Sequence, residues 1–428
     1  MRLANVLRFY WKTKHLRFGS RAALEHHQQR QLQRFMSKHL ARSQYFAPFA
    51  GYPLDAWPIM TKVTMMEQFD RLNTAKLKLA DVLACALEAE RTRDFTKTVD
   101  GYSVGLSSGT SGSRGVFVVS PAEQARWAGV MLARLLPRGL FSGERVALFL
   151  RANNNLYSAI RSPWLSFEFF DLMEPLASQF TRLSRYAPTI IVAPAQVLRA
   201  LAEAKSRGQA DIHPRRVISG AEVLEPFDRD FLARAFGAVG EVYQATEGFL
   251  GSTCPHGTLH LNESHVYFEP QWLDEQRFVP VITDFTRVTQ PIVRYRLDDI
   301  LVKRDAPCPC GSHEMAIARI EGRCDDLLRF PGRDGMVEVY ADAISRALAQ
   351  ILPITADYRL MQTGKTRLAL HVEGVGDEAL ANCRAHLERF LMRQGVQTER
   401  LIWSLDMRLP AADFSMKRRR IMRAGDAR

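Results

Sequence analysis

Ser107-Ser108-Gly109-Thr110-Ser111-Gly112-Ser113-Arg114-Gly115 is the stretch from which the fold of this chain can be worked out. It contains three glycines, four serines, one threonine and one arginine, and it lies between two strand-like pieces, 102–106 and 116–119. Glycine permits unusual backbone angles and close approach, so hydroxyl and N–H groups can surround an anion while Arg114 adds positive charge. The stretch predicts a polyphosphate cradle or, in a simpler interpretation, a flexible hairpin turn. It is not a Walker loop, because Gly-Lys-Ser/Thr is missing and no helix begins at its end.

Downstream of the loop, strands and helices alternate. Ser120-Pro-Ala-Glu123 is a capping box with proline at the first helical position, and it predicts a helix over 122–136. Short apolar strands are expected at 145–150, 188–193, 216–219 and 240–243, with helices at 196–206 and 226–236. This alternation favours an α/β domain with a largely parallel sheet. Ligands bind past the carboxyl ends of such strands, where two polar segments stand, 220–222 and 244–248.

Beyond Gly248 the pattern changes to antiparallel strands, expected at 265–269, 278–284 and 292–296 as a small β unit. A shorter α/β segment follows Ile320–Asp326 and ends in a basic run, Lys417–Arg420. The predicted fold class is therefore α/β. We expect a large N-terminal domain at 1–324, with the sheet and the small β unit, and a smaller, mobile C-terminal α+β domain at 325–428.

Composition narrows the class of protein further. The chain has 428 residues, 46% of them hydrophobic, so it is large enough for two or more domains. No apolar run approaches the ~20 residues of a membrane span, and no signal peptide is recognisable, so we expect a cytoplasmic protein. The net charge is +12, and the first 42 residues hold ten Lys/Arg and one acid, Glu25. This region predicts one amphipathic helix, which either packs as a surface helix with a solvated basic face or touches a membrane or nucleic acid.

The cysteines suggest a metal. Cys308-Pro-Cys310-Gly is preceded by Cys254-Pro-His256-Gly-Thr-Leu-His260. Thiolates and an imidazole from two loops form a soft four-ligand set that suits tetrahedral Zn²⁺. The predicted structural zinc ligands are Cys254, His260, Cys308 and Cys310, with His256 as the alternate. In the alternative interpretation these are small buried thiols.

The order and spacing of these motifs resemble the adenylate-forming enzymes, the superfamily of acyl-CoA synthetases and luciferases. The nearest branch looks like the phenylacetate–CoA ligase group, and the resemblance extends from about Trp57 to Ile421. It implies that a carboxylic acid, aryl or fatty, reacts with Mg²⁺ and ATP to give an acyl-adenylate. The acyl group then passes to a thiol, that of coenzyme A or of a carrier protein.

The resemblance also implies a role for each motif. The expected ATP- or AMP-binding residues are Ser107, Ser108, Gly109, Thr110, Ser111, Gly112, Arg114, Gly220, Ala221, Glu222, Tyr243, Asp299 and Arg323. Thr246 would contact the α-phosphate, Glu247 would hold Mg²⁺, and Lys417 would reach the reacting carboxylate and α-phosphate. Asp325 would be the hinge residue between the two domains. Aromatic stretches at 149–157 and 164–170 would line an apolar acyl pocket or simply pack in the core.

The chain departs from the family pattern in three motifs. Arg114 stands where lysine is common, Leu297-Asp298 replaces Thr-Gly before Asp299, and Met416 replaces the glycine before Lys417. They leave open a catalytically degenerate member that binds nucleotide or a partner without catalysis. A basic nucleic-acid-binding protein is the third interpretation, against which the lack of a recognised module weighs. For the ligase we expect no nucleic-acid partner and no transmembrane segment, and a homodimer stays open.

Overall fold

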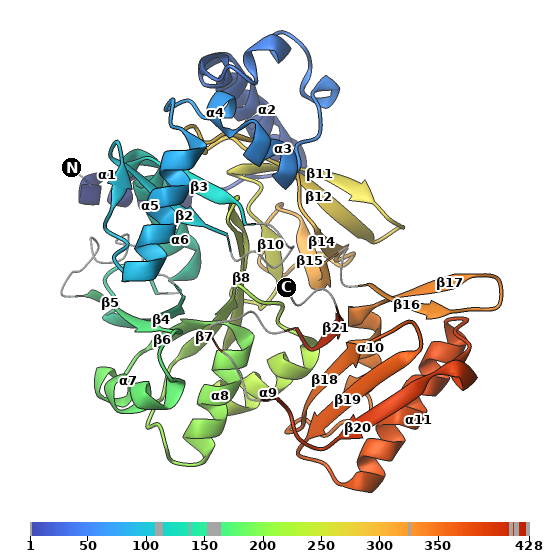
Figure 1. Cartoon of the computed structure of the whole chain (residues 1–428). Coiled ribbons are helices and arrows are strands. Elements are labelled where there is room, and N and C mark those ends of the chain that lie inside the picture. Colours follow the sequence, from blue (N-terminus) through green and yellow to red (C-terminus); the bar gives the residue numbers. More distant parts are fainter. Residues whose placement is uncertain are drawn as a thin grey trace.

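A mixed twelve-stranded sheet forms the centre of the molecule (Figure 1). The computed structural model describes residues 2–107, 114–136, 138–151, 164–323, 327–410, 414 and 419–424. The parallel part of the sheet contains β5 (Leu165–Asp171), β4 (Glu144–Leu150), β6 (Ile190–Ala193), β7 (Arg216–Gly220) and β8 (Val239–Ala245), in that spatial order. The sheet continues antiparallel through β9 (Gly248–Thr253), β10 (Leu259–Leu261), β15 (Ala316–Arg323), β14 (Asp299–Lys303), β12 (Arg277–Asp284) and β11 (Val266–Trp272), with β13 (Ile292–Arg296) also paired to β12.

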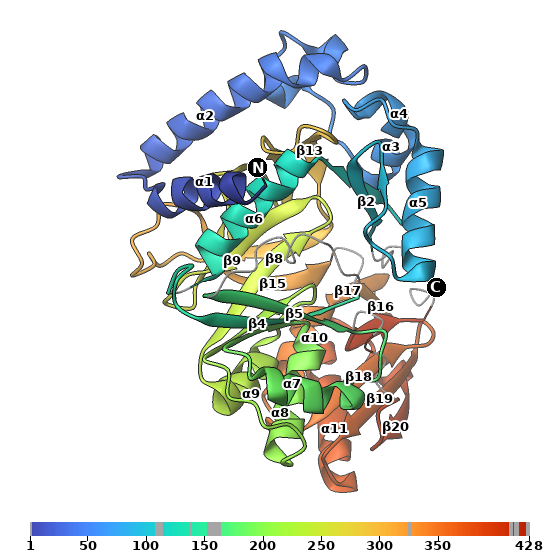
Figure 2. The same cartoon turned by 90° about the vertical axis from the view of Figure 1, so that its left-hand side faces the viewer.

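Helices cover both faces of the parallel part, because its strands are apolar on both sides. On one face lie α6 (Pro121–Leu135) and, outside it, α1 (Arg2–His15). The opposite face is covered by α7 (Phe180–Tyr186), α8 (Ala195–Ser206) and α9 (Pro226–Phe236). Figure 2 shows the two sets of helices on either side of β4 and β5. The α2 helix (Arg21–Lys38) packs over the antiparallel strands instead, through Leu32 and Phe35.

The serine/glycine-rich loop joins two strands of a separate small sheet, as its flanking residues predict. This sheet has the order β1 (Thr98–Val99), β2 (Tyr102–Leu106) and β3 (Val116–Val119). The preceding helices, α3 (Lys62–Glu67), α4 (Phe69–Leu72) and α5 (Leu79–Thr92), cover it. The β3 strand is tied to the large structure by Gln290, whose side chain accepts from the Val118 N–H at 2.8 Å and donates to the Val116 carbonyl at 3.1 Å.

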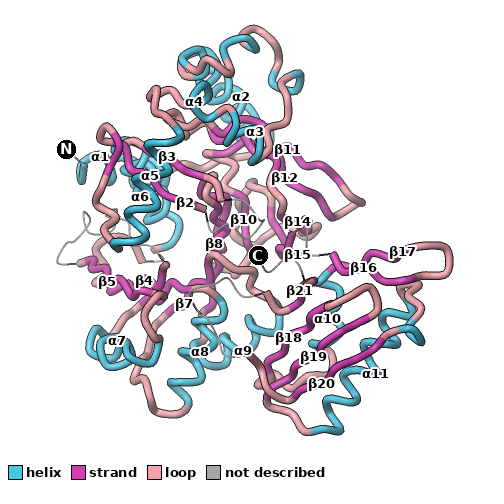
Figure 3. The backbone as a smooth tube through the Cα atoms, viewed as in Figure 1, coloured by secondary structure: helices cyan, strands magenta, loops and turns pink. Residues whose placement is uncertain are grey.

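The C-terminal unit is built on a four-stranded sheet with helices against it (Figure 3). Its strand order is β20 (Ile402–Asp406), β19 (Arg367–Glu373), β18 (Asp357–Gln362) and β21 (Ile421–Arg423). A two-stranded ribbon of β16 (Leu327–Pro331) and β17 (Met336–Tyr340) precedes it, and its helices are α10 (Ala341–Ala349) and α11 (Asp377–Arg393). Its apolar core also takes in Phe227 of α9, so the two parts of the molecule are in contact.

Two expectations about segments need correction. The N-terminal region forms two helices rather than one, because Gly19-Ser20 interrupts it and the Ser20 hydroxyl caps α2 by accepting from the Ala23 N–H at 3.1 Å. The strands beyond Gly248 do not form a separate β unit; β9 pairs antiparallel with β8 and extends the same sheet. Among the described residues, no helix combines the length and apolar composition needed to cross a bilayer.

Candidate functional site

Glu222 lies just past the carboxyl end of β7 and is held in place from α8. Gly220 ends the strand, and Ala221 has a φ of +67°, a left-handed conformation that costs a non-glycine residue free energy and that turns the chain sharply. The Glu222 carboxylate accepts from Gln196 Nε2 at 2.8 Å and from the Gln196 backbone N–H at 3.3 Å. Arg151, past the end of β4, lies 3.6 Å from the same carboxylate. Helix α8 and the residue that follows β4 therefore fix Glu222 from two sides.

Tyr243 and Asp299 come from distant segments and meet directly. The Tyr243 hydroxyl donates to Asp299 Oδ2 at 2.8 Å, and the Tyr243 side chain is buried. Asp298 is half-exposed and lies 3.7 Å from Arg296. The structure therefore brings Asp299, rather than Asp298, to the β8 segment.

Thr246 and Glu247 are positioned through their backbone by a buried arginine. Arg287 Nη1 donates to the carbonyl oxygens of both residues at 3.3 Å, and Nη2 approaches the Val118 carbonyl at 3.5 Å. Arg287 is only 8% exposed. One guanidinium thus connects the predicted Mg²⁺ and α-phosphate residues to strand β3, which leads out of the serine/glycine loop.

Glu123, the acid of the capping box, and the buried Asp284 both lie near enough to Arg287 to stabilise its charge. Besides closing the box with Ser120, the Glu123 carboxylate accepts from the Val288 N–H at 2.6 Å, the Thr289 N–H at 2.8 Å and the Thr289 hydroxyl at 2.5 Å. Burial alone would raise the pKa of Glu123, but the neighbouring Arg287 charge and these hydrogen bonds lower it below its ordinary value of 4.5. Glu123 therefore stays ionised at neutral pH and fixes the turn that carries Arg287.

Arg114 points to an acid of its own chain. Its guanidinium forms a two-pronged ion pair with Glu90 at 2.9 and 2.5 Å, and its Nε donates to the Ser107 carbonyl at 3.1 Å. The Ser107 hydroxyl accepts from the Gly115 N–H at 2.8 Å and closes the base of the loop. The ion pair between Arg114 and Glu90 must open before the positive charge of Arg114 can bind an anion in this loop.

A cavity of about 100 Å³ gathers several of the predicted segments. It is lined by Gln196, Glu222 and Gly322 of the large part and by Arg419 of the C-terminal unit. Ser108, Gly109, Thr110, Ser111, Gly112, Asp325, Lys417 and the side chain of Arg323 lie outside the described residues.

A second, smaller cavity is apolar. It measures about 50 Å³ and lies between α6 and the parallel strands, with Trp127, Met131, Leu148, Phe167, Val192 and Ile218 among its lining residues. Phe149 and Phe170, which the sequence suggests as acyl-pocket residues, stack on each other 4.7 Å apart in the core on the other face. Only Phe167 of the aromatic residues in 164–170 lines this cavity; residues 152–163 lie outside the described part of the chain.

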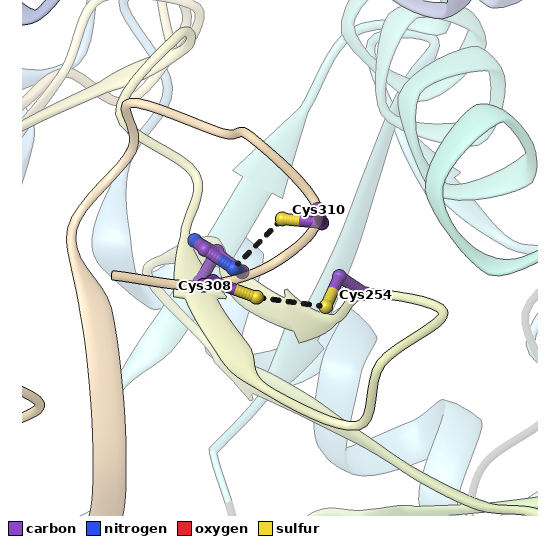
Figure 4. Close-up of side chains that lie close together, drawn as sticks. Cys254, Cys308 and Cys310 are labelled. Atoms are coloured by element: carbon purple, nitrogen blue, oxygen red, sulfur yellow. Dashed lines mark hydrogen bonds between the residues drawn. The ribbon is translucent and has the colours of Figure 1, made fainter. Parts of the chain in front are cut away.

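The predicted zinc ligands converge from the loop after β9, from strand β10 and from the loop between β14 and β15 (Figure 4). The donor atoms of Cys254, His260, Cys308 and Cys310 all lie within 4.8 Å of one another. Cys254 Sγ is 3.6 Å from Cys308 Sγ, close to the ~3.8 Å that tetrahedral Zn–S bonds of ~2.3 Å require. Cys310 Sγ is 3.3 Å from His260 Nε2, while His260 Nδ1 lies 3.0 Å from the Glu314 carbonyl, which can hold the ring in orientation. The donor set fits a soft tetrahedral ion, with His260 rather than the exposed His256 facing the cysteines.

Sequence reasoning missed Arg287 and Gln196 and recognised Glu123 only as a helix cap. Nothing in the local pattern marks a buried arginine that binds backbone carbonyls from another strand. The signal available for Glu123 was the capping box, which accounts for its contacts with Ser120 but not for those with Val288 and Thr289.

Comparison with known sequences and solved structures shows which proteins resemble this chain. No protein-family model matches the chain. Protein CapK of Staphylococcus aureus is 28% identical over 120 residues, 27% of this chain and 26% of CapK, so the match spans about a quarter of that relative's length. Among solved structures, 2-hydroxyisobutyryl-CoA ligase in the postadenylation state, in complex with an adenylate, superposes with a TM-score of 0.66 at 18% identity, over 93% of this chain and 88% of that one.

Two further solved structures have lower TM-scores. The same ligase in the thioesterification state, with its adenylate and CoA, has a TM-score of 0.52 at 19% identity, over 94% of this chain and 89% of that one. An amide bond synthetase from Marinactinospora thermotolerans has a TM-score of 0.53 at 11% identity, over 75% and 68% of the two chains. The chain therefore has the fold of the adenylate-forming ligases, as the order of its motifs predicts.

Proposed function

We propose that this chain is an adenylate-forming ligase that activates a carboxylic acid with ATP and passes the acyl group to a thiol, that of coenzyme A or of a carrier protein. The observation that carries the proposal is that Glu222 and Glu247 follow the carboxyl ends of the neighbouring parallel strands β7 and β8, where Tyr243 of β8 binds Asp299. The structural neighbours include a ligase in complex with an acyl-adenylate and CoA, which supports the same two-step chemistry. We assign 1–324 to the adenylating domain and 325–428 to the small domain.

In the first step a carboxylate oxygen attacks the α-phosphorus of ATP, and the bond from that phosphorus to the pyrophosphate breaks. Catalysis of such a transfer is mainly positioning and neutralisation of charge. Tyr243 and Asp299 would bind the adenosine, the serine/glycine loop the outgoing phosphates, and Thr246 the α-phosphate. Mg²⁺, which prefers carboxylate oxygens, would be held by Glu247 and would offset phosphate charge. Lys417 would approach the two reacting anions.

In the second step the thiol sulfur attacks the acyl carbonyl carbon and AMP leaves with the bonding electron pair. The carbonyl is already activated by the phosphate leaving group, so the protein's task is to admit the thiol and to exclude water. We assign the acid's apolar end to the cavity beside Ile218 and Leu148. Both residues stand two positions before the ends of their strands, about 7 Å below the sheet edge at ~3.3 Å per residue.

Pyrophosphate release from ATP, measured across a panel of acids, tests this function. We expect release that depends on the carboxylic acid and is greatest for compact apolar acids, aryl or short alkyl, because the small apolar cavity offers no polar partner. A thermal shift with ATP but no release with any acid would instead favour a degenerate nucleotide-binding protein, for which the Arg114–Glu90 pair is the supporting observation. Salt-sensitive binding to DNA or RNA without any effect of ATP would contradict both.

We further propose that the Cys/His cluster holds a structural zinc ion. The expected result is one equivalent of zinc per purified chain, measured by atomic emission. Cys310→Ser should lose most of this metal and unfold at lower temperature, because three ligands no longer close the tetrahedron. Cys85→Ser, which changes a half-buried thiol elsewhere, is the matched control. Full zinc content in Cys310→Ser would contradict the assignment.

A further inference from the structure

An exposed aromatic pair stands at the start of two parallel strands. Phe141 lies in the loop before β4, and Trp164 lies immediately before β5. Their rings meet edge to face, with centroids 5.7 Å apart. Aromatic side chains of this size gain free energy when they leave water, so two of them exposed side by side indicate a partner.

Helix α1 continues this surface. The Tyr10 hydroxyl reaches the loop that carries Phe141, since a Cβ added to Gly139 would lie 3.3 Å from Tyr10 Oη. Trp11 packs against Tyr10, with ring centroids 5.3 Å apart, and stacks on His15 at 5.5 Å. Contacts on both sides therefore hold the indole of Trp11 in one orientation next to this loop.

A row of apolar side chains follows α1 beside its buried side. Leu3, Leu7 and Trp11 recur at intervals of four residues, so they lie along one side of the helix. Leu7 packs partly against the core. Leu3, Trp11, Phe141 and Trp164 are between 47% and 63% exposed, and we call these four residues the aromatic face. Figure 2 looks onto this part of the molecule, with α1 above β4 and β5.

Cations flank the aromatic face on both elements. Arg8 and Lys14 stand three residues before and after Trp11, so they neighbour it on the surface of α1. Arg138 belongs to the same loop as Phe141. None of these three cations forms an ion pair within the part of the chain that the structure describes. Their charges are therefore available to an anionic partner.

Positive charge also accumulates on the other side of α1. Arg8 and Arg126 of α6 both lie over the Phe9 ring, 6.0 and 4.9 Å from its centroid. Partial burial, and after it the charges of Arg126, Arg8 and Arg34, lower the pKa of Lys12 below its ordinary value of 10.5. Cations that crowd in this way repel one another, so an anionic surface beside α1 would be attracted and would relieve the repulsion.

A lipid surface fits these features better than a protein or a nucleic acid. Tryptophan and other aromatic rings settle at the headgroup level of a bilayer, where lysine and arginine bind anionic headgroups. The cores of protein interfaces are depleted of charged residues, whereas Arg8 and Lys14 stand directly beside Trp11. Nucleic acids are bound mainly through their phosphates, which leaves Leu3 and Phe141 without a role.

We propose that the aromatic face and its flanking cations bind the surface of bilayers that contain anionic lipids, while α1 stays packed on α6. Figure 1 shows α1 and the C-terminal unit on opposite sides of the molecule, so a bilayer at α1 would leave the cavity beside Glu222 open to water. This surface role is independent of the proposed ligase activity, because vesicle binding needs neither ATP nor an acid.

The test is sedimentation of the full chain with vesicles of phosphatidylcholine, with and without phosphatidylglycerol. We expect binding to the vesicles that contain phosphatidylglycerol, and weaker binding in added salt, which screens exposed charges. Lys14→Gln should weaken the binding about fivefold, the effect of losing one cation near an anionic membrane. Lys303→Gln, which removes an exposed cation of β14 outside this face, is the matched control.

Trp11→Gln and Phe141→Gln should each weaken vesicle binding about tenfold, because each removes an apolar side chain that leaves water at the bilayer. Both positions are exposed, so the unfolding temperature of the variants should match that of the parent. Trp272→Gln on β11 is the control, because Trp272 is 48% exposed and Trp11 is 47% exposed.

Failure of the parent to bind either kind of vesicle would overturn the inference. Equal binding by the parent and the Trp11→Gln and Phe141→Gln variants would overturn it too, because the cations alone would then account for the attraction. A parent that binds no vesicles but forms a dimer in sedimentation equilibrium, which the same two substitutions dissociate, would show that a second copy of the chain covers this face instead.

Discussion

Lys417→Ala is expected to slow acyl-adenylate formation by about 10²–10³-fold, the usual effect of removing one group that stabilises developing charge in a preorganised site. The carboxylate and the α-phosphate are both anions, so their approach depends on a cation between them. Transfer of the acyl group from supplied acyl-adenylate to the thiol should continue, because that step no longer brings these two anions together. The two half-reactions are compared by pyrophosphate exchange and by thioester formation.

The matched control for this variant is Arg418→Ala, which removes the adjacent charge from the same basic run, Lys417–Arg420. A general electrostatic effect of the basic run would slow acyl-adenylate formation equally in both variants. A specific role for Lys417 requires that Arg418→Ala keep most of its adenylating activity. Equal loss of both half-reactions in Lys417→Ala, or a larger effect of Arg418→Ala, would assign the catalytic cation elsewhere.

Glu123→Gln should destabilise the folded chain by about 1–3 kcal/mol at neutral pH, the range for leaving buried hydrogen-bonding groups without a partner. The amide cannot accept all the donors from Ser120, Val288 and Thr289, and the substitution removes one of the negative charges near the buried Arg287. Because Arg287 holds the carbonyls of Thr246 and Glu247, activity should fall as well. Denaturant unfolding measures the difference, with Glu88→Gln, an exposed pair with Arg91, expected to cost under about 1 kcal/mol.

The effect of Glu123→Gln should also depend on pH. The pKa of Glu123 is lower in the folded chain than its ordinary value of 4.5, so its carboxylate contributes fully above that value. The contribution is lost as the pH falls through the folded pKa. The difference in unfolding free energy between the parent and the variant should therefore be constant near neutral pH and shrink below about pH 4.5. A difference that grows with acidification would contradict the role assigned to this carboxylate.

Local signals predicted the parallel half of the molecule well. The capping box at Ser120 placed α6 correctly, and 226–236 matches the bounds of α9. Such features depend on neighbours a few residues away, which a sequence displays directly. The sequence did not predict that the sheet continues through β9, β10, β14 and β15. This continuation depends on pairing between residues as far apart in the chain as His260 and Ala316.

In the candidate site, too, the sequence predicted some features and not others. The order of the motifs indicated Tyr243 and Asp299 as site residues, and in the structure a hydrogen bond joins them. The sequence already favoured His260 over His256, and the structure places His260 beside the three cysteines because His260 lies on strand β10. The ion pair that occupies Arg114 could not be predicted, because Glu90 belongs to a helix that the sequence places in no relation to the loop.

Gly129 on α6 allows α1 to approach so closely that an added Cβ would lie 2.6 Å from the Val6 carbonyl oxygen. Val6 and Tyr10 are buried in this contact, so the apolar side of the first helix is already used within the protein. The helix therefore cannot serve as a detachable arm that inserts into lipid without first uncovering α6. A protein expressed without its first fifteen residues should therefore aggregate, because the apolar surface of α6 that α1 covers would be exposed.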